Sequence, residues 1–461
     1  MSSMPHHGEE PSPRPRPIVF RGLPEPILPT RPHLVSLYSA ASEFAKRADE
    51  QIRSSRLGKL SQWEVCHSAL WARHIPPRES VLPAPMELLD QLYGGRTKDG
   101  MIPSAISCTG CAAQDNEMVP PPILAWAELE WFGVTGDLVR IARVVPLLEG
   151  HTDWIFAQRS AGNGALVFGR GPRNARGSIA ATAAAAHHCQ CLASLALLVG
   201  EDDIARKNSL RYLELKHIAN DSMWDDARGV YSDIDEDDYW AEPVRAGMYW
   251  ALLADIPTPE RRATMVHHLR SYRDFARNHM VPSLAAREKG FSPNGEPYSG
   301  GVWPSTVHMV ARGLEFAGED LLAHHIALNH LENVAEVHRE TGKFWEYYAP
   351  DHAAPGVDAK PISFGWTALS VVALLLENVL GISINGPAGE VTWNLLLEDE
   401  THGVRNLRVG KSDVELYASR SEGMWMAKVR SDGPVTVHIK GRSVLRTVTL
   451  DEAGSQATRL S

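Results

Sequence analysis

The stretch that decides the fold covers residues 179–220 and has the sequence IAATAAAAHHCQCLASLALLVGEDDIARKNSLRYLELKHIAN. Its first half is rich in alanine, the residue with the highest helix propensity. Gly200 then interrupts the pattern, and glycine tolerates the left-handed conformation in which many helices end. The acids that follow it suit the positive end of a second helix dipole. The stretch therefore predicts two helices joined by a tight turn.

The same punctuation occurs at Thr135-Gly136-Asp137 and at Ala317-Gly318-Glu319-Asp320. Apolar residues also recur at three- and four-residue spacing, as on one face of a helix, through most of the chain. The segments with this spacing are 34–54, 63–74, 85–94, 120–135, 138–157, 179–199, 202–220, 243–254, 259–277, 305–316, 319–341 and 364–381. Twelve segments make six helical hairpins, so the sequence predicts a mainly helical toroid.

The two ends of the chain differ from this helical part. Residues 1–30 contain many prolines, which fix φ and remove backbone donors, so we expect a flexible tail there. From 383 to 461 the apolar period becomes two, for example in Val414-Glu415-Leu416-Tyr417, and turn residues separate the runs. This pattern predicts a small β-sandwich that closes one side of a helical domain spanning 31–382.

Composition excludes several classes of function. The chain has 461 residues, 44% hydrophobic and 22% charged, with a net charge of −10 and scattered Lys and Arg, so it carries no basic stripe for nucleic acid. No apolar run reaches the roughly 18 residues that cross a bilayer, and the first residues do not form a secretory signal. We therefore expect a cytoplasmic protein that binds a small molecule and contacts neither nucleic acid nor membrane.

Five cysteines do not suggest a disulfide framework, because their number is odd and no secretory signal precedes them. Cys108 and Cys111 have metal-knuckle spacing, and Cys189 and Cys191 follow two histidines. Residues two apart on a helix point about 200° away from each other, so Cys189 and Cys191 are not expected to share a ligand. We therefore predict free thiols, with no metal and no cofactor.

The long segments between the helices carry the candidate chemistry. Gln62-Trp63-Glu64 combines an indole with an amide and a carboxylate, the groups that stack on and hydrogen-bond to a sugar. Trp303 precedes a proline that can begin a helix, and Glu346 lies among aromatic residues that include Tyr347. Long irregular loops in compact domains usually serve function. These residues predict a carbohydrate site on one face of the ring.

In this order the motifs resemble those of the inverting (α/α)6 glycosidases, which include processing α-glucosidases, trehalases and bacterial glucosylglycerate and mannosylglycerate hydrolases. The resemblance covers roughly residues 60 to 380. It rests on the segments 62–64, 121–126, 224–226 with 229–233, 301–304, 346–350 and 364–367. The last of these contains Trp366, which corresponds to the Trp of the family's Phe-Ser-Trp-Thr motif.

The resemblance implies an inverting mechanism, in which one carboxylic acid protonates the leaving oxygen and a carboxylate activates water. Glu346 matches the family's general base. The loop in which relatives carry the acid is 162–177 here, and it contains no Asp or Glu. Its arginines, Arg170 among them, suit an anionic group on the substrate. Asp115, Glu64 and Asp233 remain as candidates for the acid.

Other positions also depart from the family. Glu64 replaces an Asp, Gly300 stands in place of an Arg, and the Gln expected before the double proline is missing around residues 118–119. Each change removes or moves a polar partner of a sugar hydroxyl, so we expect an altered substrate.

Three functions fit these residues. The first is hydrolysis of a small glycoside or sugar-like metabolite, neutral or anionic, with Glu346 as general base. The second is a non-hydrolytic sugar epimerase or tailoring enzyme on the same ring, for which His308 is available for proton transfer. The third is a sugar-binding protein that has lost catalysis. Under the first, Gln62, Trp63, Glu64, Trp303, Glu346 and Trp366 are expected to meet at one end of the ring.

Overall fold

The structure is a computed structural model of the chain. It describes residues 23–54, 59–75, 85–107, 112–113, 120–167, 175–235, 243–362, 366–397, 400–421, 424–441 and 444–460. Residues 1–22 of the expected flexible tail fall outside these ranges.

Six helices form an inner ring in which each contacts the next and the last returns to the first. They are α2 (Gln62–Ala72), α4 (Leu124–Thr135), α6 (Ile179–Leu198), α8 (Trp250–Leu253), α10 (Pro304–Phe316) and α12 (Trp366–Ala373). The outer helices are α1 (Pro32–Ser54), α3 (Pro85–Gly94), α5 (Leu138–Arg159), α7 (Asp202–Ser222), α9 (Pro259–Arg270) and α11 (Asp320–Thr341). The predicted (α/α)6 toroid is thus confirmed.

The Ala-rich segment forms α6, one of the six helices of the inner ring. Almost all its side chains are buried, and it contacts α4, α5, α7 and α8. Small side chains allow such close packing, and alanine loses no side-chain entropy in a helix. This explains why the stretch lacks the one-sided apolar pattern of a surface helix.

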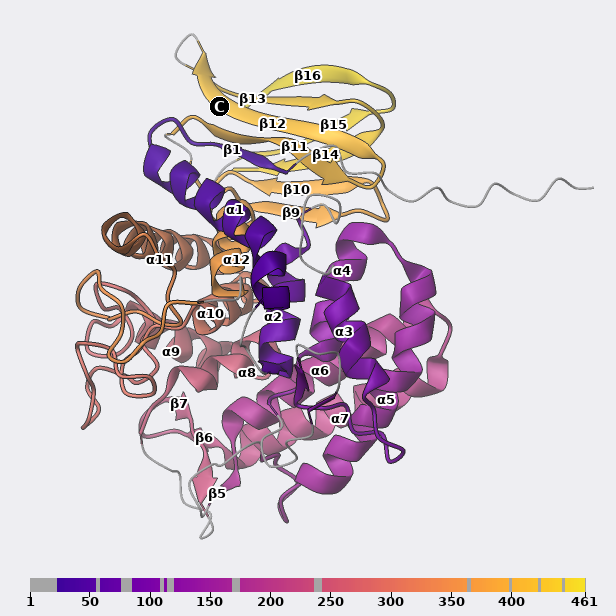
Figure 1. Cartoon of the computed structure of the whole chain (residues 1–461), viewed down its shortest axis with the longest axis vertical. Coiled ribbons are helices and arrows are strands. Elements are labelled where there is room, and N and C mark those ends of the chain that lie inside the picture. Colours follow the sequence, from indigo (N-terminus) through magenta and orange to yellow (C-terminus); the bar gives the residue numbers. More distant parts are fainter. Residues whose placement is uncertain are drawn as a thin grey trace, which may run out of the picture.

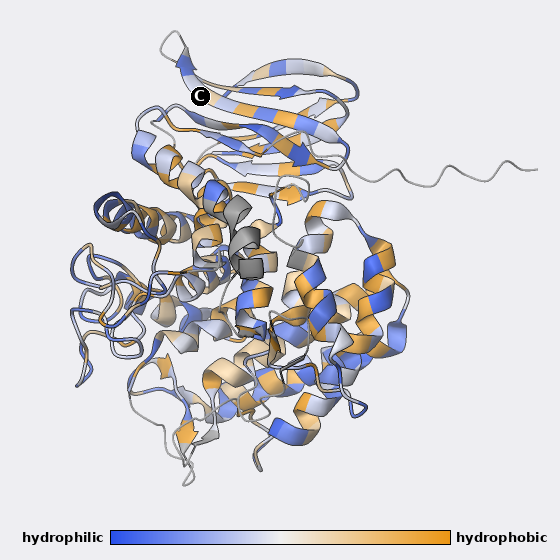
Figure 2. Ribbon diagram, viewed as in Figure 1, coloured by the Kyte–Doolittle hydropathy of each residue, from blue (hydrophilic) through white to orange (hydrophobic). Residues whose placement is uncertain are grey.

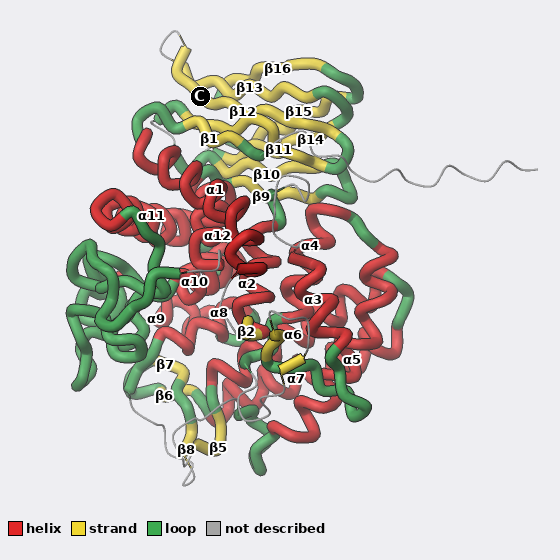
Figure 3. Tube along the Cα trace, viewed as in Figure 1, coloured by secondary structure: helices red, strands yellow, loops and turns green. Residues whose placement is uncertain are grey.

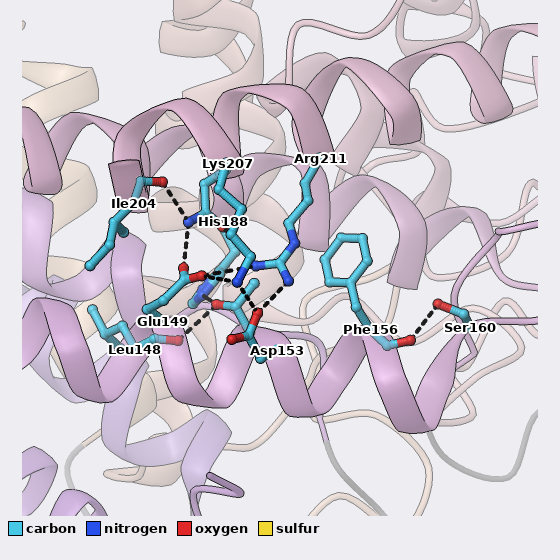
Figure 4. A network of polar contacts seen from close by, with 11 residues as sticks. Leu148, Glu149, Asp153, Phe156, Ser160, His188, Ile204, Lys207 and Arg211 are labelled. Carbon is cyan, nitrogen blue, oxygen red and sulfur yellow. Dashed lines mark hydrogen bonds and ion pairs between the residues drawn. The ribbon is translucent and has the colours of Figure 1, made fainter. Parts of the chain in front are cut away.

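Ion pairs join the outer helices α5 and α7 (Figure 4). Lys207 Nζ lies 2.7 Å from Glu149 Oε1 and 2.6 Å from Asp153 Oδ1. Arg211 bonds the same two carboxylates from the next turn of α7. Because two cations share two acids, the network fixes the register of these helices better than an isolated surface pair would.

Several helices depart from the expected ranges. Segment 259–277 is helical only to Arg270, because the chain turns back at Ser271 and the Asp274 carboxylate accepts a hydrogen bond from His268 Nδ1 at 3.0 Å. Segment 243–254 begins with the 3₁₀ turn η1 (Ala246–Tyr249). Helix α12 continues as the π-helical segment η2 (Leu374–Val379), and such turns are frequent at functional sites.

The C-terminal region is a sandwich of two sheets stacked on one end of the ring (Figure 1). The sheet orders are β1-β11-β12-β13-β16 and β15-β14-β10-β9. The strands are β1 (Glu25–Ile27), β9 (Ile382–Asn385), β10 (Glu390–Asn394), β11 (His402–Val409), β12 (Ser412–Ser421), β13 (Met424–Ser431), β14 (Val435–Lys440), β15 (Leu445–Leu450) and β16 (Gly454–Arg459). Apolar and polar residues alternate along several of them (Figure 2), as on β14, where every second side chain is buried.

One strand of this sandwich comes from the segment assigned to the tail. Residues 25–27 form β1, which pairs antiparallel with β11. The segment just before α1 therefore belongs to a sheet, and it ties the start of the helical domain to the sandwich.

Strand β9 joins the sandwich to the ring. It contacts α4 and η2, and the Gly386 N–H donates to the Gly133 carbonyl at 2.8 Å. Gly133 lies near the end of α4, so the sandwich covers the carboxyl ends of the inner helices. The amino ends of the inner helices face the opposite way. No helix in the described ranges is both long and apolar enough to span a bilayer.

Asp137 allows a test of the predicted helix boundary, in which a glycine ends one helix and an acid caps the next. Its side chain accepts the Arg140 N–H at 3.0 Å and so caps α5. We expect Asp137→Ala to lower the free energy of unfolding by about 1 kcal/mol, because a helix N–H loses its partner. Urea unfolding followed by tryptophan fluorescence measures this. Asp137→Asn, which still caps, should keep most of the stability, and an equal loss in both variants would contradict the capping role.

Candidate active site

The long loops gather at the amino ends of the inner helices, which we call the mouth of the ring. Each of the loops before α4, α6, η1, α10 and α12 leads into one of these ends. Short strands tie them together: β2 (Lys59–Ser61) pairs with β3 (Ala105–Ser107), and β5 (Ala175–Gly177) pairs with β8 (Ile234–Asp235). Figure 3 shows the loops in green, away from the sandwich.

Glu346 lies in the loop before α12, half-buried. Its backbone N–H donates to the Lys360 carbonyl at 3.2 Å, and the Lys360 N–H donates to Glu346 Oε2 at 3.3 Å. Trp345 and Pro361 pair as a β-bridge beside these bonds. The loop therefore folds back on itself and holds the carboxylate in place.

Three aromatic rings form a row next to Glu346. The Tyr347 ring centroid lies 4.5 Å from that of Trp303, and Trp303 stacks on Tyr298 at 6.1 Å with 18° between the planes. Trp303 Nε1 donates to the Pro297 carbonyl at 2.7 Å, and the Tyr347 hydroxyl donates to the Val357 carbonyl at 2.7 Å. We call Tyr298, Trp303 and Tyr347 the aromatic row. Two of its rings have fixed positions because their polar ends are bonded.

Glycines allow the row to pack this closely. A Cβ at Gly301 would lie 2.9 Å from the Tyr347 ring, and one at Gly356 would lie 2.4 Å from it. Any side chain there would displace the ring. Burial and the neighbouring charge of Glu346 both raise the pKa of Tyr347, so the phenol stays a neutral hydroxyl beside the carboxylate.

Asp233 lies at the same mouth, half-buried just before β8. Its Oδ1 accepts the N–H of Ile179, the first residue of α6, at 2.7 Å. Burial raises the pKa of this carboxyl, while the bonds from Ile179 and Ser178 and the Arg245 cation act against the rise. A carboxyl with a raised pKa is suited to donate a proton.

Arg245 links Asp233 to the aromatic row. It precedes η1 and its side chain is exposed, yet its charge is felt by Asp233, and its guanidinium donates to the Tyr298 carbonyl at 2.6 Å. Asp233, Arg245, the aromatic row and Glu346 therefore follow one another around the mouth. This places a proton donor candidate and a base candidate at the same end of the ring.

The start of α2 also lies at the mouth. The Trp63 ring lies 6.1 Å from Trp250, the first residue of α8. Gln62 is fully buried, and its Nε2 donates to the Pro103 carbonyl at 3.1 Å. Glu64 Oε2 accepts both the backbone N–H and the hydroxyl of Ser61 at 2.8 Å, which makes a capping box for α2.

The remaining candidates are placed only in part. Trp366 begins α12, so its backbone lies at the mouth. Asp115, Arg170, Cys108 and Cys111 lie outside the described residues.

The described cysteines are free thiols. Cys189 is buried towards Arg211 and Glu149 of the outer helices, whereas Cys191 Sγ lies 3.6 Å from His187 Nε2 on the axial side. The two therefore point apart, as helix geometry predicts. Among the residues that the structure describes, no three metal-ligating side chains are grouped to hold an ion.

Sequence reasoning missed Arg245, Tyr298 and Trp250. Tyr298 and Trp250 belong to aromatic-rich segments that mark the mouth, so their composition was a usable signal. Arg245 gave no signal in the sequence, because its position at the mouth depends on where the inner helix begins.

Comparison with known proteins confirms the resemblance. Residues 163–367 match the family model described as a mannosylglycerate hydrolase MGH1-like glycoside hydrolase domain. This range contains Asp233, Arg245, Trp303 and Glu346. The match identifies a domain of the glycoside hydrolase type, and the prediction of a glycosidase is confirmed at that level.

The chain is also similar to one curated protein and to several solved structures. An uncharacterised protein of Borreliella burgdorferi is 24% identical over 408 residues, which is 84% of this chain and 85% of that protein. A GH63 mannosylglycerate hydrolase of Thermus thermophilus, solved with Tris, superposes with a TM-score of 0.61 at 16% identity, over 73% of this chain and 99% of that one. A GH78 rhamnosidase of Bacillus sp. GL1 gives 0.69 at 15% identity, over 93% and 43%. These two structural similarities support the fold described above.

Proposed function

We propose, taking the glycoside hydrolase domain of residues 163–367 as the premise, that this protein hydrolyses a small glycoside with inversion and uses Glu346 as the general base. The observation that carries the proposal is the place of the Glu346 carboxylate, beside the aromatic row at the mouth of the ring. Aromatic faces stack on the CH groups of a sugar, and a fixed carboxylate next to them can activate a water molecule.

Asp233 is the best candidate for the general acid. Its raised pKa favours the protonated form that must give a proton to the leaving oxygen. Glu64 is less suitable, because its carboxylate already caps α2 through Ser61. Trp63 and Trp366 are proposed to line the sugar subsite from the starts of α2 and α12. Gln62 was expected there too, but its side chain is fully buried and bonded to the Pro103 carbonyl, so its proposed role is to hold the start of α2.

An anionic group on the substrate fits the charges at the mouth. Arg245 is exposed there. The sequence has further arginines, Arg170 among them, in the segment before α6 that lies outside the described residues. A guanidinium binds a carboxylate or a phosphate through two parallel hydrogen bonds. We therefore propose a glycoside whose aglycone carries such a group. Free thiols suit a reducing compartment, and the proposed location is the cytoplasm.

A His-based epimerase is less well supported. His308 is fully buried between Trp126 and Trp71, and burial lowers its pKa to about 3. A neutral, enclosed imidazole has no path to a substrate proton at the mouth.

Paired glycosides test the proposal. The two glycosides of a pair carry the same sugar, and only one of them has a carboxylate on its aglycone. Proton NMR identifies which anomer of the sugar is released first. We expect release of the inverted anomer and a preference for the anionic member. Arg245→Gln should raise KM for the anionic member roughly tenfold more than KM for the neutral member, because a charged hydrogen bond to the aglycone is worth about 1.5 to 3 kcal/mol.

Arg339→Gln, at an exposed position on α11, is the control and should leave both values of KM unaltered. Retention of the anomeric configuration, or no hydrolysis of any glycoside, would refute the proposal.

A further inference from the structure

Residues 277–285 cross the loops at the mouth and carry none of the groups assigned to the proposed reaction. We call them the linking segment. Arg277, at its start, donates two hydrogen bonds of 2.7 Å to the Asp351 carboxylate, and such a bidentate pair fixes direction as well as distance. Asp351 follows Glu346 in the loop before α12. The linking segment is therefore attached to the loop that carries the proposed base.

The backbone of the linking segment is strained at Val281. Its φ is 65°, in the left-handed region that a β-branched residue rarely adopts. The side chain is fully buried, and the Val281 N–H donates to the Phe275 carbonyl at 2.9 Å. Such strain persists only where the surrounding contacts determine the conformation, and it clusters at functional sites. Ser283 follows two positions later, so this conformation directs the chain to the place that Ser283 occupies.

Ser283 joins two segments of the mouth through three hydrogen bonds. Its carbonyl accepts the Ala246 N–H at 3.1 Å, and its N–H donates to the Gly301 carbonyl at 3.0 Å. Its hydroxyl accepts the Gly300 N–H at 3.0 Å. Ala246 directly follows Arg245, and the two glycines lead into the helix start that carries the aromatic row. One residue therefore fixes the segment of Arg245 relative to the aromatic row.

These bonds belong to a longer ladder across the mouth. On one side of the linking segment, Arg245 and Leu284 pair as a β-bridge. On the other side, Val302 and Tyr348 exchange two backbone hydrogen bonds, at 2.9 and 3.0 Å. Tyr348 lies close behind Glu346 in the chain. Arg245 and the proposed base thus stand on one continuous set of backbone hydrogen bonds, with the linking segment in its middle.

The Ser283 hydroxyl holds the most adaptable part of this ladder. Gly300 and Gly301 have no side chains that would restrict their backbone, so neighbouring bonds must select one conformation. Gly300 adopts a φ of 143°, and a Cβ there would collide with the Ser292 carbonyl, so no other residue fits. The hydroxyl fixes the Gly300 N–H, and a substitution can delete it while the backbone bonds of Ser283 remain.

We propose, in an inference that rests on the proposed function, that Ser283 is a positioning residue: it sets the spacing between Arg245 and the aromatic row and thereby the preference for an anionic aglycone. A charged hydrogen bond to a carboxylate requires a defined distance and direction. If the glycine turn shifts, a sugar stacked at the row no longer presents its aglycone to the guanidinium. Ser283 acts through these neighbours and not by contact with the substrate.

Titration calorimetry on the full chain tests this role, with the propyl and 2-carboxyethyl glycosides of glucose and of mannose as probes. The two aglycones differ by one carboxylate in place of a methyl group. We expect the protein to bind the carboxyethyl member of at least one pair more tightly. Ser283→Ala should lower this preference roughly fivefold, because one hydrogen bond to the glycine turn is lost. Ser283→Thr keeps the hydroxyl and should keep the preference.

Ser292→Ala is the matched control. It removes a half-buried hydroxyl from the same loop, and this hydroxyl forms no hydrogen bond with any residue that the structure describes. We expect both affinities to stay unchanged in this variant.

The double variant Arg245→Gln with Ser283→Ala separates positioning from a general loss of structure. If Ser283 acts through Arg245, the second substitution should not change the preference any further. Independent losses in the double variant, a preference that Ser283→Ala leaves intact, or no preference in the unaltered protein would overturn the proposal. The affinities do not depend on turnover, so the expected affinities without any hydrolysis would refute the hydrolase and leave the positioning role in place.

Discussion

A Glu346→Gln protein is expected to turn over its substrate roughly 10² to 10⁴-fold more slowly than the unaltered protein, with little change in ligand affinity. The amide keeps the shape of the side chain and can still accept the Lys360 N–H. It cannot take a proton from water. An effect confined to kcat therefore separates the base from a residue that merely holds the sugar.

The measurement is steady-state hydrolysis together with calorimetric binding of the same glycoside. Glu340→Gln is the matched control, since Glu340 is an exposed carboxylate at the end of α11. Full turnover by Glu346→Gln would remove the catalytic assignment of Glu346.

The second large effect concerns Asp233. Asparagine keeps the oxygen that accepts the Ile179 N–H but has no proton to give. For Asp233→Asn we expect kcat on an alkyl glycoside to fall about 10² to 10⁴-fold. An aryl glycoside with a good leaving group needs little protonation, so on that substrate the loss should be much smaller.

The pH dependence of the hydrolysis rate gives an independent test of this role. A general acid works only while protonated, so the rate should fall as pH rises through the raised pKa of Asp233. Asp233→Asn should abolish this alkaline limb. Asp221→Asn, an exposed change at the end of α7, is the control. Equal losses on alkyl and aryl glycosides with an unchanged pH profile would assign Asp233 a structural role at the start of α6.

Much of the fold follows from local sequence. Gly136 and Gly318 both adopt positive φ between helices, as their places in the pattern predict, and segment 85–94 has the expected bounds. Apolar spacing alone placed the start of α4 too early, at residue 120. The helix begins at Leu124, because the three prolines before it keep the chain extended although the apolar spacing continues through them. The π-helical segment η2 gave no local signal, since its geometry depends on the surrounding packing.

The candidate site could be predicted only where a motif carries the residue. Glu346 and Trp303 stand in recognisable segments, and both lie at the mouth. The capping role of Glu64 depends on Ser61, and the composition of 62–64 favoured a sugar contact instead. Asp233 was one of three candidates for the acid, and only its burial against the start of α6 distinguishes it. The cavity between the carboxyl ends of the inner helices and strand β9 had no sequence signal, because it forms between residues such as Arg73 and Ser383 that are far apart in the chain.

The pairing of β1 with β11 has a consequence for synthesis of the protein. Glu25 is among the first described residues to leave the ribosome, yet its partner Arg405 follows 380 positions later. Helices α1 and α2 likewise wait for α12, which they contact. The early part of the chain therefore emerges with an open sheet edge and an open ring, and contacts over such sequence separations form slowly. Neither the edge of β1 nor the open side of α2 is covered until residues 366–409 have been synthesised.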